Sequence, residues 1–112
     1  MTSEKQFKQS LQDGKMIESV DEMTEGYKDA LTTILIGSGD TEYMSAPAYY
    51  EQSMNAPSLN ARTSCVSVIQ DELGHGHIAY RLLEDLGISR EELIYGREPH
   101  EFRNTYGFDQ PI

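Results

Sequence analysis

A carboxylate and an imidazole lie one helical turn apart in the segment that runs from Asp71 to His77. Glu72 and His75 are three residues apart, so in a helix they would project from the same face. Helical bundles that bind iron use this Glu-x-x-His spacing to bring a carboxylate and a ring nitrogen to one metal ion. The spacing alone is common by chance, so the prediction depends on both side chains pointing into a core.

The surrounding pattern favours a core position for both residues. Over residues 58–86 apolar side chains recur every three or four positions, as on the buried face of an amphipathic helix. The stripe consists of Cys65, Val68, Ile69, Glu72, His75, Ala79, Leu82, Leu83 and Leu86. An ionised carboxylate buried without a partner costs several kcal/mol, and a divalent cation removes that cost. The alternative is a Glu and a His on the helix surface, which the spacing also permits.

A second carboxylate falls on the expected core face of an earlier helix. The apolar side of that helix is formed by Tyr27, Leu31, Ile34, Leu35 and Ser38. Continuing this line by four residues reaches Glu42, whereas Asp40 lies around the helix and is the less favoured ligand. The alternative interpretation of Glu42 is a solvated residue near a helix end. We therefore predict a metal site formed by Glu42, Glu72 and His75.

The elements that must position these residues are all predicted to be helices, which makes the fold class all-α. Ser19 and Glu22 form a capping box, so the first long helix is expected from there to about residue 44. A second helix is expected over residues 58–86, ended by Gly87 in the left-handed conformation. Ser89 opens a short third helix through about Tyr95.

The connection between the two long helices is expected to be irregular because it contains Pro47 and Pro57, with one helical turn over residues 48–52. Glu42 would lie near the end of the first helix and Glu72 about 14 residues inside the second, so a tight hairpin would separate them by roughly 18 Å. A connection over residues 45–57 can extend to about 43 Å and bring the two carboxylates level.

Three parts of the chain are expected: a flexible leader over residues 1–15, a half-bundle over residues 16–96, and an irregular tail over residues 97–112 that packs against nothing. Two helices of about 24 and 29 residues cannot enclose a core by themselves. Either a second copy of the chain or a C-terminal half must complete a four-helix bundle.

Composition excludes several classes of function. Nineteen acidic and nine basic residues give a net charge of −10, which repels nucleic acids and anionic membrane surfaces. No apolar stretch approaches the roughly 20 residues that span a bilayer, and a single cysteine cannot form an intrachain disulfide, so we expect a cytoplasmic protein. An anionic ligand would need a local basic patch, for which the candidates are Arg62, Arg81, Arg90, Arg97 and Arg103.

Other residues that could carry chemistry have simpler interpretations. Cys65 is expected in the core, His77 on the surface or behind the ligands, and His100 in solvent. The tyrosines are interpreted as packing and interface residues. Glycines inside the helices indicate close helix packing or room for a substrate beside the metal; they are Gly37, Gly39, Gly74 and Gly76.

The segment Gln70-Asp71-Glu72-Leu73-Gly74-His75-Gly76 resembles the Gln-Asp-Glu-Ala-Gly-His-Gly signature of the phenylacetic acid catabolic family. The resemblance covers roughly residues 26–93. It implies a ferritin-like di-iron bundle in which Glu42 is a terminal ligand, Glu72 a bridging ligand and His75 the nitrogen ligand of the same iron. Family members continue with a second Glu and a second Glu-x-x-His, and neither follows in this chain. The resemblance therefore implies half of a di-iron site.

The implied activity is epoxidation or hydroxylation of the ring of an aromatic acyl-CoA, such as phenylacetyl-CoA, with dioxygen as oxidant. Other epoxidase subunits and a reductase would be partners, because the chain has no motif for a flavin, a nicotinamide or an iron-sulfur cluster. Two alternatives remain open. One is a ferritin-like protein that binds and oxidises iron, and the other is a non-catalytic structural subunit, which the retained ligand types disfavour.

Overall fold

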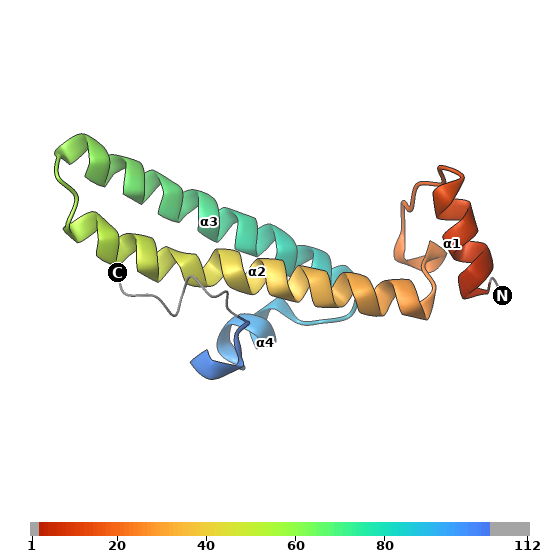
Figure 1. The fold of residues 1–112 in the computed structure, drawn as a ribbon. Coiled ribbons are helices and arrows are strands. Elements are labelled where there is room, and N and C mark those ends of the chain that lie inside the picture. The colour runs from red at the N-terminus through yellow and green to blue at the C-terminus, as the bar shows by residue number, and fades with distance from the viewer. Residues whose placement is uncertain (1–2, 104–112) are drawn as a thin grey trace.

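The computed structural model describes residues 3–103, and its regular elements over that range are all helical. Two long helices, α2 (Glu25–Met54) and α3 (Leu59–Asp85), run antiparallel side by side (Figure 1). The shorter elements are α1 (Glu4–Gln12), α4 (Arg90–Tyr95) and the 3-10 turns η1 (Val20–Glu22) and η2 (Pro99–Glu101). The predicted all-α fold with two long antiparallel helices is confirmed.

The start of α2 differs from the prediction. The capping box of Ser19 and Glu22 is present, but it closes only the short turn η1. The long helix begins later, at Glu25, where the hydroxyl of Thr24 accepts a hydrogen bond from the backbone N–H of Tyr27. A capping box satisfies the backbone groups of one turn, and it does not require the helix to continue.

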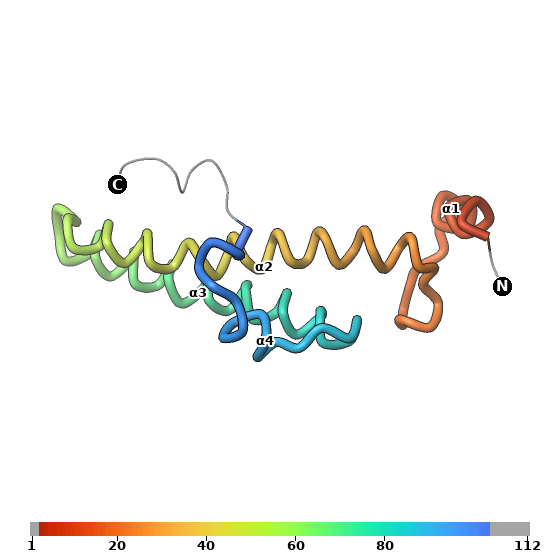
Figure 2. The backbone as a smooth tube through the Cα atoms, turned by 90° about the horizontal axis from the view of Figure 1, so that it is seen from below, coloured from red at the N-terminus to blue at the C-terminus, as the bar shows by residue number. Residues whose placement is uncertain are grey.

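A helix, α1, occupies most of the segment expected to be a leader. Ser3 caps it, and its Phe7 is buried with its ring edge-on to Tyr27, at 5.3 Å between centroids. The Glu4 carboxylate accepts hydrogen bonds from the hydroxyl of Thr24 and the backbone N–H of Gly26. Figure 2 shows α1 at the far end of α2 from the hairpin. The Glu4 side chain of α1 thus caps the N-terminal end of α2.

The predicted break over residues 45–57 is wrong, because α2 continues through Pro47 to Met54. Proline removes one helical hydrogen bond, but Ser45, Ala46 and Ser53 are buried on either side of it, and this packing keeps the helix intact. The carbonyl oxygens at the new helix end accept from the Arg62 guanidinium at 3.1 and 3.4 Å. The connection is therefore a short turn rather than a climbing loop.

The longer α2 explains how the acidic residues become level. Glu42 lies twelve residues before the end of α2, and Glu72 lies thirteen residues after the start of α3. Both are therefore roughly 18–20 Å from the hairpin, at about 1.5 Å per residue. The prediction that the two carboxylates lie at one height holds, although a tight hairpin achieves it.

The second half of the described chain follows the predicted boundaries closely. Ser58 caps α3, Gly87 follows its end with a φ of +92°, and Ser89 caps α4. The core is small and lies where α4 folds back on the long helices. Its buried members are Tyr80, Leu83 and Leu93. None of the helices in residues 3–103 is long and apolar enough to span a membrane.

Candidate metal centre

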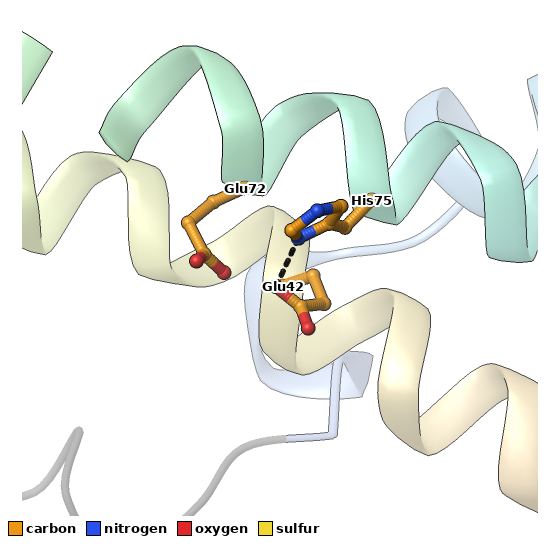
Figure 3. A group of neighbouring side chains, drawn as sticks. All are labelled: Glu42, Glu72 and His75. Atoms are coloured by element: carbon orange, nitrogen blue, oxygen red, sulfur yellow. Dashed lines mark ion pairs between the residues drawn. The ribbon is translucent and has the colours of Figure 1, made fainter. Parts of the chain in front are cut away.

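Glu42, Glu72 and His75 lie together midway along the helix pair, as Figure 3 shows. One potential ligand atom from each side chain falls within 4.8 Å of the other two. The Nδ1 atom of His75 is 3.4 Å from Oε2 of Glu42, across the gap between α3 and α2. The structure thus brings together the three residues that the sequence singles out, from helices that meet only through the fold.

Local hydrogen bonds orient the two carboxylates. The hydroxyl of Ser45 is 2.7 Å from the backbone carbonyl oxygen of Glu42 and 3.3 Å from Oε2 of Glu72. Since the hydroxyl has a single proton, the Glu72 carboxylate receives only part of one donor. Among residues 3–103, the other hydrogen-bonding neighbour of the Glu72 carboxyl group is the Glu42 carboxyl group, with which it would have to share a proton.

The charge at the centre is unbalanced. The neighbouring Glu42 carboxylate, by hydrogen bonding and repulsion, raises the pKa of Glu72 above its ordinary value, and burial adds to the shift. Two carboxylates that face one another favour either a shared proton or a bound cation. Two carboxylate groups and one imidazole form a donor set that suits a divalent first-row metal such as iron. The chemistry of the site therefore fits the metal that the sequence predicts.

The centre is open on one side. The His75 side chain is 56% exposed and that of Glu42 35% exposed, so these residues lie at the rim of the helix pair. The prediction that His75 and Glu42 point into the core is therefore wrong, because this side of the helix pair is not covered by other described residues. The buried face of α3 is instead formed by Gly76, Ala79, Tyr80 and Leu83. Large apolar side chains within about two turns of the centre along the same helices are also exposed, namely Ile34 of α2 and Ile78 and Leu82 of α3. Apolar side chains exposed around a polar centre are typical of a surface that another element covers.

Glycines allow the close helix approach at this level. A Cβ atom on Gly39 would lie 2.7 Å from the Tyr80 ring, and one on Gly76 would lie 3.2 Å from the Tyr43 side chain. Gly37 and Gly74 have no such neighbours among the described residues. Close packing is therefore the role of one glycine on each helix, and the other two have open space beside them.

A second polar cluster, which the sequence analysis missed, lies beside the centre. Asp40 is fully buried, and its carboxylate accepts four hydrogen bonds at 2.7–2.9 Å. The donors are the Tyr80 hydroxyl, both terminal nitrogens of Arg97 and the backbone N–H of Arg103. Asp40 is thus a structural anchor, and it is not part of the candidate ligand group. The prediction that Asp40 lies away from the core face is wrong, because Asp40 is fully buried whereas the Glu42 side chain is 35% exposed.

The Asp40 cluster corrects the prediction that the tail packs against nothing for residues 97–103, whereas residues 104–112 of the predicted tail lie outside the described residues. Residues 97–103 fold onto α2, and the Arg97 guanidinium stacks 4.0 Å from the centroid of the Phe102 ring. Burial alone would raise the pKa of Asp40, but the bonds from Arg97, Arg103 and Tyr80 outweigh it, so that pKa is lowered. Burial and the adjacent carboxylate raise the pKa of Tyr80, so its hydroxyl stays protonated and donates.

Most of the arginines considered for an anionic ligand are already engaged. Four of the five contact acceptors in the chain. Arg62 donates to a backbone carbonyl at the end of α2, and the other three form ion pairs: Arg81 with Asp85, Arg90 with Glu84, and Arg97 with Asp40. Arg103 instead lines, together with Glu42, a hollow of about 550 Å³ on the outer side of α2. His77 and His100 are exposed and Cys65 is half-buried, and none of them belongs to the ligand group.

Comparison with known proteins places the chain in a family. The family model described as phenylacetic acid catabolic protein matches residues 1–112. The chain belongs to that family. It is similar to one of the subunits of 1,2-phenylacetyl-CoA epoxidase from Escherichia coli (strain K12), with 29% identity over 93 residues. The match covers 83% of this chain and 30% of that relative's length. No solved structure matches the chain.

Proposed function

We propose that this member of the phenylacetic acid catabolic family supplies one half of a di-iron centre in an oxygenase. The substrate of that oxygenase would be an aromatic acyl-CoA of the phenylacetyl-CoA type. One observation carries the proposal: Glu42, Glu72 and His75 approach within 4.8 Å across two helices. Family membership and the similarity to an epoxidase subunit supply the reaction class.

The ligand residues have distinct roles in this proposal. His75 provides a neutral nitrogen donor, and Glu42 a carboxylate on the opposite helix. Glu72, which receives only part of the Ser45 hydroxyl donor, would serve as the bridging carboxylate that the family resemblance implies. When bound, iron supplies the redox chemistry that activates dioxygen. The chain's own contribution is to hold the donors at fixed positions on two neighbouring helices.

The open side of the centre supports the proposal of a half-site. The exposed ligands and the neighbouring apolar side chains require a cover that brings further carboxylate and histidine donors. Either a second copy of the chain or a C-terminal half of a longer protein would supply it. Beside Glu42, the 550 Å³ hollow offers room for part of a substrate, and Arg103 at its edge is a cation that an acyl-CoA could contact.

The test is iron content per chain, measured together with the mass of the assembled protein. We expect iron to bind to the wild type and to be lost in Glu72→Ala. Asp71→Ala is the matched control, because Asp71 is the exposed neighbour of Glu72 and lies on the outer face of α3. Unchanged iron content in Glu72→Ala would refute the assignment of this residue as a ligand.

Two further measurements separate the oxygenase from its alternatives. Rapid oxidation and mineralisation of ferrous iron without an acyl-CoA would instead indicate a ferritin-like protein. Binding to a catalytic partner with no stoichiometric iron would indicate a structural subunit. The oxygenase predicts product formation from an aromatic acyl-CoA when a reductant, dioxygen and the completing half are supplied.

A further inference from the structure

The two polar clusters of the molecule are close neighbours along the same pair of helices. Asp40 precedes the ligand Glu42 by two residues on α2, and its partner Tyr80 follows the ligand His75 by five residues on α3. On the other side of the ligand group, Ser45 of α2 contacts Glu72 of α3. Along the helix pair, Glu42 and His75 therefore lie between two polar interhelical contacts, Asp40–Tyr80 on one side and Ser45–Glu72 on the other.

These two contacts differ greatly in strength. The Ser45 hydroxyl is 3.3 Å from Glu72 and also serves a backbone carbonyl. The Tyr80 hydroxyl donates to Asp40 at 2.7 Å, and both side chains are fully buried. A short, charge-assisted hydrogen bond that is shielded from water is strong and strict in its geometry. The Asp40–Tyr80 contact is thus the better candidate for fixing one helix against the other.

The close helix contacts beside this hydrogen bond depend on the same register. At the level of the candidate ligands the helices meet at Gly39, against the ring of Tyr80, and at Gly76, against the side chain of Tyr43. Sliding α2 against α3 by one residue would shift the ligands by about 1.5 Å. Two donors bound to one ion by bonds of about 2.0–2.2 Å can be at most about 4.4 Å apart. The candidate ligand atoms lie within 4.8 Å of one another, so they must already approach slightly to share one ion, and a slide that separates them by about 1.5 Å more would prevent it.

We infer that Asp40 and Tyr80 are positioning residues for the metal centre: their hydrogen bond fixes the register of α2 against α3 and so sets the separation between Glu42 and His75. Arg97 completes the device, because its guanidinium holds the Asp40 carboxylate through both oxygens. The inference concerns the arrangement of the ligands, and only its metal readout rests on the proposed function. Buried polar networks are known to specify one structural arrangement.

The test compares two variants of the full-length chain that lose stability for different reasons. Tyr80→Phe removes one hydroxyl and keeps the ring that packs against Gly39. Leu83→Val, one turn away in the same core, removes a methylene group without changing any polar contact. Helix content and thermal unfolding, followed by circular dichroism, establish that each variant is folded.

The first measurement needs no metal. In the metal-free wild type, we expect nuclear Overhauser effects between the Glu42 side chain and the His75 ring, because Oε2 of Glu42 lies 3.4 Å from Nδ1 of His75. These contacts should weaken or disappear in Tyr80→Phe and persist in Leu83→Val. Asp40→Asn, which keeps the shape of the side chain but removes the charge that holds Arg97, should disturb them further.

The second measurement is the binding of Co²⁺, followed by its visible absorption. We expect Tyr80→Phe to bind Co²⁺ at least tenfold more weakly and with an altered spectrum, in line with the effect of residues behind metal ligands. Leu83→Val should keep the wild-type spectrum. Persistence of the Glu42–His75 contacts in folded Tyr80→Phe would overturn the inference. If the wild type binds no Co²⁺ but its contacts still depend on Tyr80, the metal proposal fails and the positioning role stands.

Discussion

Two carboxylates on α2, only two residues apart, have opposite surroundings. Asp40 is fully buried and accepts four hydrogen bonds from protein groups, including a bidentate pair from Arg97. Glu42 is 35% exposed and faces another carboxylate and an imidazole. The first carboxylate is neutralised within the chain, whereas the second belongs to a group that could hold a metal ion. The comparison separates a structural polar site from the candidate metal site.

Removing the partner of Asp40 should have the largest effect on stability. Arg97→Ala leaves a buried carboxylate with two of its four hydrogen bonds and no cation, which typically costs about 3–5 kcal/mol. We expect this loss in the free energy of unfolding, measured with urea. The control is Arg81→Ala, which breaks an exposed ion pair with Asp85 and should cost less than about 1 kcal/mol. Equal effects of the two substitutions would show that burial does not distinguish the pairs.

The glycine positions offer a second way to test the contrast between packed and open surroundings. In Gly39→Ala the new methyl group would lie 2.7 Å from the Tyr80 ring and 3.1 Å from the Ala79 side chain, forcing the helices apart. Such overpacking typically costs about 1–3 kcal/mol. Gly37→Ala is the matched control on the same helix, since no described residue comes within 4 Å of its new methyl group.

The two alanine variants should therefore change thermal stability in opposite directions. Gly37→Ala should stabilise the protein by up to about 1 kcal/mol through helix propensity alone. Gly39→Ala should lower the melting temperature and weaken Co²⁺ binding, because the ligands are held across the same gap. A stabilising Gly39→Ala would mean that the helices separate at little cost.

Sequence patterns predicted those features that depend on local spacing. The Glu-x-x-His pair, the caps Ser58 and Ser89 and the helix end at Gly87 are all encoded within a few residues. Periodicity also selected Glu42 rather than Asp40 for the predicted metal site, but it did not predict that Asp40 is the buried residue of the two.

What the sequence could not predict depends on contacts between distant segments. Packing on both sides of Pro47 preserves a helix that local preference would end. The Asp40–Arg97 pair joins residues 57 positions apart, and no local pattern marks such a pair. The exposure of His75 follows from the open side of the helix pair, which a periodic stripe does not reveal.

The pKa of Asp40 and the pKa of Glu72 are shifted in opposite directions, and we expect this to change how stability depends on pH. This effect should be smaller than those of the Arg97 and Gly39 substitutions. The pKa of Asp40 is lowered in the folded protein, so its contribution is present above the ordinary value of 3.8 and is lost as the pH falls through the lowered pKa. The pKa of Glu72 is raised by Glu42 and by burial, so its contribution to stability depends on pH in the opposite direction. Its stabilising contribution is complete below the ordinary value of 4.5 and is lost as the pH rises through the raised pKa.

Substitution of Glu72 should reveal this sign in metal-free protein kept in a chelator. At pH 7 Glu72→Gln removes one of two facing negative charges and should stabilise the protein by less than about 1 kcal/mol, because the centre is partly open to solvent. The gain should shrink as the pH falls through the raised pKa and should be absent below 4.5, where the wild-type carboxyl group is itself protonated. Asp40→Asn should behave oppositely, with its largest destabilisation at pH 7. Urea unfolding at a series of pH values measures both. If Asp40→Asn stabilised the protein at pH 7, the contrast between Asp40 and Glu72 would be refuted. Both carboxylate charges would then destabilise the metal-free protein.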